Sequence, residues 1–136
     1  MHNLIVAGLD GMRARIPAME TVATEYVYGK DVGRAVDLAA TVARPKQIAF
    51  NIGSGAITPF EDVLAAVKAL CPGLTYEVEP GEAAKTTISP LDISAAKREL
   101  GWEPRFTIAT AFEDYLAELK AARAQQLPES VQIKGN

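Results

Sequence analysis

The sequence predicts an α/β fold that is dominated by helices and contains a few short strands. Several stretches place apolar residues three and four positions apart, as on one face of a helix. Between them lie short segments that are rich in β-branched and aromatic residues or that alternate apolar and polar residues, and both patterns are typical of strands. The chain has 136 residues, of which 49% are hydrophobic and 23% charged, so it has the size and composition of one globular domain.

The first part of the chain contains two predicted helices and two predicted strands. Residues 1–12 carry a short apolar run with helical character, and residues 24–28 (TEYVY) are a short strand. Asp31 is expected to cap a helix over 31–43, because the apolar residues that follow it share one helical face. Residues 47–52 (QIAFNI) are expected to form a mostly buried strand.

The next helix has the clearest start signal in the sequence. Thr58 is the predicted N-cap, Pro59 is the first helical residue, and Glu61 stands three residues after the cap, as in a capping box. The sequence Cys-Pro-Gly at 71–73 ends this helix. Residues 74–79 (LTYEVE) then alternate apolar and polar residues and predict a half-buried strand.

The last part of the chain combines a polar loop with two more helices. Residues 80–91 are expected to form the loop, and Ser94 to cap a short helix that Gly101 ends in a left-handed conformation. Trp102 is expected to fold back onto the core. Thr107 is predicted to cap the final helix, whose buried face consists of Ile108, Ala111, Phe112, Tyr115, Leu116 and Leu119.

The composition excludes several classes of function. The chain has 14 Lys and Arg against 17 Asp and Glu, a net charge of −3, so it has no basic field for nucleic acid or an anionic membrane. No apolar stretch is long enough to span a bilayer, and the first residues lack the features of a signal peptide, so we expect a cytoplasmic protein. The only cysteine is Cys71, and the only histidine, His2, lies where we expect a mobile terminus. We therefore expect no disulfide, no metal site, and no histidine-based catalysis without a second chain.

Two motifs invite a nucleotide-related interpretation. Tyr26 and Lys30 have the Tyr-x-x-x-Lys spacing of short-chain dehydrogenases, but that chemistry needs both residues on one helical face, and here the segment is predicted to be a strand. We therefore expect a structural role. The turn at 53–58 (GSGAIT) follows a predicted strand and precedes a helix, which resembles part of a dinucleotide fingerprint. Thr58 and Pro59 delay that helix, so a glycine turn without ligand is the favoured interpretation and a nucleotide site is the alternative.

Four segments in order carry a resemblance to a known family. YVYGKDVGRAV, FNIGSG, TPFEDVLAAV and LDISAAKRELGWEPR together resemble the carboxy-terminal lobe of the extended short-chain dehydrogenases, the NAD-dependent epimerase/dehydratase family. The resemblance covers about residues 4–120. The last segment reads physically as a capped helix with a glycine stop, in which Asp92 is a turn or cap residue and Trp102 a core residue.

The resemblance implies a division of the chain and of the enzyme. Residues 1–124 would be the substrate-binding lobe and residues 125–136 a frayed tail. The Rossmann lobe of the family, which holds NAD or NADP and the catalytic tyrosine and lysine, would be missing, so we expect no cofactor for this chain alone and no catalytic residue in it. Residues 47–52 would be the strand that joins the edge of the missing sheet.

The resemblance also suggests where a substrate would bind. Sugar-nucleotide members of the family bind the diphosphate with arginines, but the corresponding positions here fall near Thr24 and near Glu82 and Lys85. A smaller or non-nucleotide substrate is therefore the open alternative. The residues predicted to contact substrate are Thr24, Tyr28, Asn51, Glu82 and Lys85. The expected partners are a sugar or sugar-nucleotide substrate in the complete enzyme, and either the missing Rossmann lobe or a second copy of the chain. The alternative function is a non-catalytic homo-oligomeric interaction module derived from this lobe.

Overall fold

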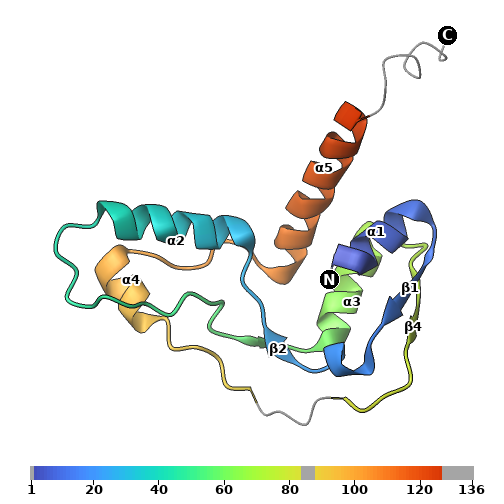
Figure 1. The fold of residues 1–136 in the computed structure, drawn as a ribbon, viewed down its shortest axis with the longest axis horizontal. Coiled ribbons are helices and arrows are strands. Elements are labelled where there is room, and N and C mark those ends of the chain that lie inside the picture. The colour runs from blue at the N-terminus through green and yellow to red at the C-terminus, as the bar shows by residue number, and fades with distance from the viewer. Residues whose placement is uncertain (1, 84–87, 127–136) are drawn as a thin grey trace.

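The computed structural model describes residues 2–83 and 88–126, and over these residues it confirms a helix-rich α/β fold with short strands (Figure 1). The helices are α1 (His2–Asp10), α2 (Gly29–Thr41), α3 (Phe60–Leu70), α4 (Ser94–Leu100) and α5 (Ile108–Gln126), together with a short 3₁₀ helix, η1 (Ala18–Glu20). The strands are β1 (Arg13–Ile16), β2 (Thr24–Glu25), β3 (Ile57–Thr58) and β4 (Thr75–Val78).

The strands form two separate pairs. β1 and β4 are parallel, with Arg13 opposite Thr75, so the predicted strand at 74–79 is confirmed. β2 and β3 are antiparallel, with Thr24 opposite Thr58. Because β3 offers only two residues for pairing, the strand predicted at 24–28 is shorter than expected, and residues 26–28 connect it to α2 without regular structure.

The larger hydrophobic core lies between α1, α3, α5 and the β1–β4 pair. Ile5, Val63 and Val67 are fully buried in it, and Phe112 and Leu116 of α5 complete it. Fully burying an aliphatic side chain contributes about 1.5–3 kcal/mol, so this cluster is the main source of stability in the described part of the chain.

A smaller core joins α2 to α4 at the other end of the molecule (Figure 1). Its centre is Trp102, which is fully buried beside Ala35, Ala96 and Leu100. Gly101 has φ 65°, and the Trp102 N–H donates to the Ala96 carbonyl at 3.2 Å. The predicted glycine stop and aromatic anchor are therefore confirmed.

Two predicted helix caps are wrong. Asp31 lies inside α2, which begins two residues earlier at Gly29, and its carboxylate is used elsewhere. Thr58 belongs to β3 and makes no cap hydrogen bond, because the pairing with β2 holds its backbone and Pro59 takes the N-cap position of α3. The predicted capping box with Glu61 is therefore absent.

The caps of the last two helices are closer to the prediction. Ser94 begins α4 instead of preceding it, and its N–H donates to the Asp92 carboxylate at 2.9 Å, so Asp92 is the capping side chain. Thr107 caps α5 as predicted, because it exchanges hydrogen bonds with Thr110, N–H to hydroxyl in both directions. α5 continues to Gln126, past the boundary predicted at 124, and residues 127–136 lie outside the described part.

The strand predicted at 47–52 is not formed. No described strand lies beside this segment, and most of it is exposed, with Ile48 fully so. Only Phe50 and Ile52 pack against the smaller core. The sequence pattern of a buried strand is therefore present at 47–52 without a sheet to bury it.

Candidate functional site

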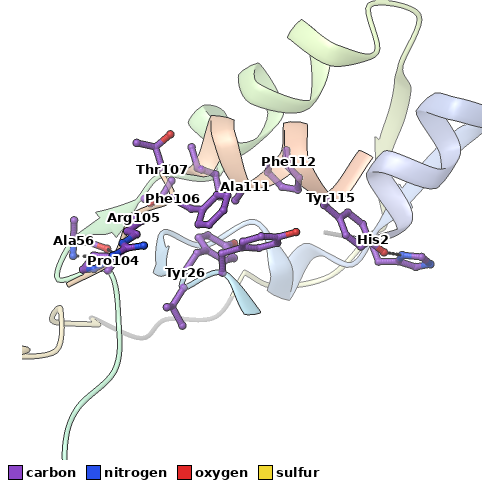
Figure 2. Close-up of a pocket in the computed structure, with 15 residues that line it drawn as sticks. His2, Tyr26, Ala56, Pro104, Arg105, Phe106, Thr107, Ala111, Phe112 and Tyr115 are labelled. Atoms are coloured by element: carbon purple, nitrogen blue, oxygen red, sulfur yellow. Dashed lines mark hydrogen bonds between the residues drawn. The ribbon is translucent and has the colours of Figure 1, made fainter. Parts of the chain in front are cut away.

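A pocket of about 560 Å³ opens between α5, the β2–α2 junction and the turn before β3 (Figure 2). Its walls are mostly aromatic and aliphatic, which is typical of small-molecule sites. The side chains that line it are His2, Tyr26, Val27, Tyr28, Ser54, Ala56, Thr58, Pro104, Arg105, Phe106, Thr107, Ile108, Ala111, Phe112 and Tyr115.

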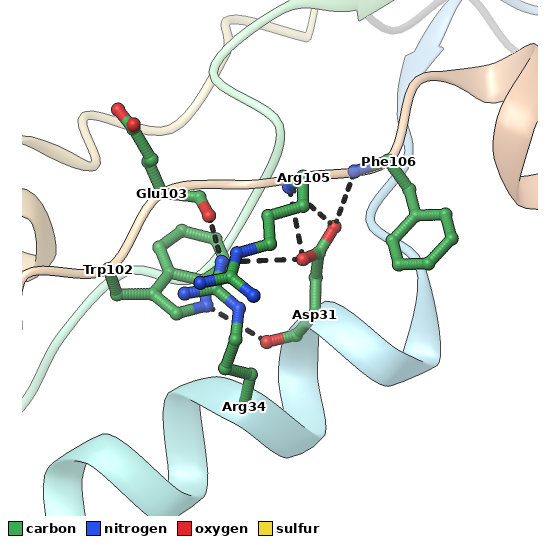
Figure 3. A network of polar contacts seen from close by, with 6 residues as sticks. All are labelled: Asp31, Arg34, Trp102, Glu103, Arg105 and Phe106. Carbon is green, nitrogen blue, oxygen red and sulfur yellow. Dashed lines mark hydrogen bonds and ion pairs between the residues drawn. The ribbon is translucent and has the colours of Figure 1, made fainter.

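The buried carboxylate of Asp31 positions one wall of this pocket (Figure 3). The N–H of Arg105 lies 3.0 Å from both carboxylate oxygens, and the N–H of Phe106 donates to one of them at 3.1 Å. The indole N–H of Trp102 donates to the Asp31 carbonyl at 2.9 Å, and Arg34 lies 3.4 Å from the carboxylate. Because charge-assisted bonds to buried backbone N–H groups are strong, residues 102–106 are fixed to α2.

Tyr28 is held at the pocket by a polar cluster on α5. Its hydroxyl donates to Asp114 at 2.7 Å, and its ring packs on Phe106 with centroids 4.8 Å apart. Lys30 lies 2.6 Å from both Asp114 and Glu118. Burial and the hydrogen bond to Asp114 raise the pKa of Tyr28 to about 12. The hydrogen bonds from Lys30 and Tyr28 lower the pKa of Asp114, and those to Asp114 and Glu118 raise the pKa of Lys30.

Tyr26 and Lys30 lie in different surroundings and do not form a catalytic pair. Tyr26 lines the pocket, whereas Lys30 is bound by the carboxylates of α5. Burial and the nearby Glu20 raise the pKa of Tyr26, which is opposite to the lowered pKa that a catalytic tyrosine of this type needs. This arrangement is that of structural residues.

The glycine turn at 53–55 already holds an anion from the protein itself. Glu25 accepts from the Gly55 N–H at 2.6 Å and from the Leu91 N–H at 2.8 Å. A Cβ placed on Gly53 would lie 2.3 Å from the Glu25 carboxylate, so a larger residue there would force the end of the Glu25 side chain to move. The turn therefore does not fit the pyrophosphate of a dinucleotide, because a carboxylate occupies the amide group that would bind it.

His2 is a pocket residue that the sequence did not reveal. It lies in the first turn of α1, and its Nδ1 is 2.5 Å from the Tyr115 hydroxyl. The structure thus places His2 in a helix beside Tyr115, whereas its mobility stays a prediction. The two residues are 113 positions apart, and no local pattern links them.

The predicted contact residues that the structure describes are not gathered at the pocket. Of the four that are described, Tyr28 lines it. Thr24 pairs with Thr58 across the β2–β3 ladder, and the Asn51 side chain donates to the Asp92 carbonyl at 3.1 Å. Glu82 does not line the pocket, and Lys85 lies outside the described residues.

Residues 2–83 and 88–126 contain no group of His, Cys, Asp and Glu that could hold a metal ion. Within the same ranges, no helix combines the length and the apolar character needed to cross a membrane.

Comparison with solved structures identifies proteins of the same fold, although no protein-family model and no curated protein matches the sequence. The UDP-glucose 4-epimerase of Thermotoga maritima, solved with UDP-glucose, is 25% identical with a TM-score of 0.70, and the match covers 88% of this chain and 38% of that one. The UDP-glucuronic acid 4-epimerase of Bacillus cereus, in complex with NAD, is 20% identical with a TM-score of 0.67, over 87% and 38%. The enzyme WbmF of Bordetella bronchiseptica, in complex with NADH, is 21% identical with a TM-score of 0.71, over 89% and 36%.

The chain thus spans less than half the length of each of these enzymes. The resemblance inferred from the ordered motifs is confirmed: the chain has the fold of one portion of the extended short-chain dehydrogenases, the group that contains the NAD-dependent epimerases and dehydratases.

Proposed function

We propose that residues 1–124 form the substrate-binding lobe of an NAD-dependent epimerase/dehydratase-like enzyme that acts on a sugar or sugar nucleotide. The observation that carries this proposal is the match to the Thermotoga epimerase, which takes in 88% of this chain and 38% of that one. When bound in the complete enzyme, NAD supplies hydride transfer. The residues of this chain bind and orient the substrate and exclude water from it.

The exposed segment 47–52 supports a further sheet in the complete enzyme. Ile48 is fully exposed, and Val36 of α2 is also exposed on the α2–α4 half of the molecule. An exposed apolar segment with the pattern of a strand, beside which the described residues place no strand, offers a surface that another sheet can cover. The proposed substrate contacts remain Thr24, Tyr28, Asn51, Glu82 and Lys85, and the position of Tyr28 at the pocket supports its inclusion.

The experiment compares residues 1–136 with the product of the longer reading frame. We expect the codons upstream of Met1 to encode a glycine-rich strand–turn–helix and a second Tyr-x-x-x-Lys. The longer product should bind NAD in a calorimetric titration, and residues 1–136 should not, because Glu25 occupies the glycine turn. Micromolar NAD affinity of residues 1–136 alone would contradict the proposal.

The second candidate, a homo-oligomeric interaction module, is favoured by the exposure of Ile48 and Val36. Sedimentation should then show a dimer that Ile48→Asp dissociates. Met19→Asp is the matched control, because Met19 is also exposed but lies on η1. A clean monomer of the unmodified chain at micromolar concentration would count against this candidate.

A further inference from the structure

One face of the β2–β3 ladder forms a wall of the pocket. Thr24 lies opposite Thr58, so continuing the antiparallel register places Tyr26 opposite Ala56. Directly opposite residues share a face of a sheet, and so do alternate residues along one strand. Tyr26, Ala56 and Thr58 accordingly all line the pocket. The ladder therefore contributes two hydroxyl-bearing side chains, those of Tyr26 and Thr58, to the same wall.

The hydroxyl groups of the lining suit a ligand that donates hydrogen bonds. Tyr28 gives its proton to Asp114 at 2.7 Å, so its oxygen can only accept from a ligand. The hydroxyls of Tyr26 and Thr58 have no partner among the described residues, so each can accept and donate. Burial and the nearby Glu20 raise the pKa of Tyr26, so its hydroxyl keeps the proton at neutral pH. The O–H groups of a sugar both donate and accept, whereas the oxygens of a diphosphate only accept.

The opposite wall of the pocket is apolar. Figure 2 shows Tyr26 below Phe106, Ala111 and Phe112, and all four residues line the pocket. A sugar ring has an apolar C–H face besides its hydroxyl groups, and the negative face of an aromatic ring attracts such C–H groups. The volume of about 560 Å³ is typical of small-molecule sites with apolar walls and a few polar groups. The pocket thus offers a partner to each side of a sugar ring.

Within the described residues, the lining directs no lysine or arginine side chain into the pocket. Arg105 is the one such residue in the lining, and Figure 3 shows its side chain extending toward Arg34 and Trp102. The Gly55 N–H of the nearby glycine turn is already bound by Glu25. Guanidinium groups and free backbone N–H groups are the usual partners of a diphosphate. The pocket therefore favours an uncharged group.

We propose that this pocket holds the uncharged sugar ring of the substrate, with hydroxyl groups of the ring bound by Tyr26 and Thr58 and its C–H face against the aromatic wall. The inference rests on the proposed function and deepens it, because it assigns the sugar ring to this pocket and places any diphosphate outside it. Tyr26 and Thr58 join Tyr28 as binding residues, and the role of Tyr26 is to bind a hydroxyl group, not to transfer a proton.

The test is a two-dimensional NMR titration of the 136-residue chain with three probes. Methyl β-glucopyranoside carries the sugar ring, cyclohexylmethanol carries a ring without the sugar hydroxyls, and UDP carries a diphosphate and a nucleoside without the hexose. We expect the glucoside to shift the backbone N–H signals of Thr58 and Phe112. It should bind about tenfold more tightly than cyclohexylmethanol, because two additional hydrogen bonds distinguish the two ligands.

Two outcomes would overturn the inference. One is the absence of shifts at these signals with the glucoside, and the other is equal or tighter binding of either other probe at the same signals. Tighter binding of UDP would still agree with a nucleotide-sugar substrate. The NAD titration of the longer product tests the proposed function independently, so the two proposals can fail separately.

Two conservative variants locate the sugar hydroxyls. Thr58→Val keeps the β-branched shape in β3, Tyr26→Phe keeps the ring, and each removes one hydroxyl group. Each should weaken binding of the glucoside about fivefold and leave that of cyclohexylmethanol unchanged. The controls Thr75→Val and Tyr76→Phe make the same changes on β4, where neither residue lines the pocket, and should leave both affinities unchanged. Glucoside affinities in Thr58→Val and Tyr26→Phe that equal those of the controls would overturn the assignment of these two residues.

Discussion

Replacing Asp31 by asparagine tests the contact that fixes the 102–106 segment to α2. The Asp31 side chain is 1% exposed, and its two oxygens accept three short contacts from the backbone N–H groups of Arg105 and Phe106. An asparagine oxygen at the Oδ2 position can still accept from both N–H groups, but these two bonds lose the negative charge, and the NH₂ group then faces the Arg34 guanidinium 3.4 Å away. Loss of the charge weakens each of the two hydrogen bonds by about 1 kcal/mol, and the Arg34 guanidinium without its carboxylate partner costs about 1 kcal/mol more. We therefore expect the free energy of unfolding to fall by about 3 kcal/mol.

Trp102 provides the signal for this measurement. It is the only tryptophan, it is fully buried, and its indole donates to the Asp31 carbonyl, so its fluorescence reports directly on this region during urea unfolding. The matched control is Asp37→Asn, an exposed position on the same helix, which should change stability by less than about 0.5 kcal/mol. A loss below about 1 kcal/mol for Asp31→Asn would refute the view that these bonds hold the two segments together.

Two further predictions concern the glycine turn and the polar cluster on α5. Gly53→Ala should lower the midpoint of urea unfolding, because it forces the Glu25 carboxylate away from the turn. The control Gly33→Ala lies in α2, and its added Cβ meets no atom within 4 Å, so this variant should leave the midpoint unchanged or raise it. Equal effects of the two variants would contradict the close approach of Glu25 to Gly53. Lys30→Met should raise the pKa of Asp114 toward its ordinary value in an NMR titration, because the hydrogen bond from Lys30 is the largest cause of its lowering. Because the pKa of Asp114 is lower in the folded chain than in the unfolded chain, Asp114 stabilises the fold at pH values above its unfolded pKa, and this stability is lost as the pH falls through its folded pKa. The variant should therefore lose less stability on acidification. An unchanged Asp114 pKa would contradict this prediction.

Local features of the fold were predictable because the residues that form them are close in sequence. The helix stop at Gly101 needs only a residue that tolerates positive φ, and the cap of α5 needs only Thr107 and a partner three residues on. The strand β4 followed from its alternation. In each case either the hydrogen-bond partner lies a few residues away in the sequence, or the alternation of apolar and polar residues is enough to predict the element.

Features that depend on distant contacts were not predictable in the same way. Asp31 is a suitable N-cap by type, but its oxygens are used by N–H groups 74 and 75 positions away. The turn at 53–55 has a phosphate-binding pattern, but Glu25 fills it from another strand. His2 reaches Tyr115 across 113 positions. Residue type indicates what a side chain can do, while the distant partner decides what it does.

The pocket is not predictable from the sequence for the same reason, although the ordered motifs do show the family resemblance. Its lining comes from α1, the β2–α2 junction, the turn before β3 and β3 itself, the segment 104–107 and α5, so no single motif marks it. The predicted contacts were chosen by position relative to the family, and of those described only Tyr28 lines the pocket. The strand predicted at 47–52 is wrong for the converse reason, because its local pattern favours a strand but the described residues offer no strand to pair with it.

The separation between Asp31 and its backbone donors has a consequence for how the nascent chain matures. Asp31 leaves the ribosome 74 residues before Arg105 does. At synthesis rates of about 5–20 residues per second, this delay lasts about 4–15 seconds. During that interval the Asp31 carboxylate is hydrated and the apolar side of α2 around Ala35 has no Trp102 to cover it. Closure of this half of the molecule is therefore a late event in translation.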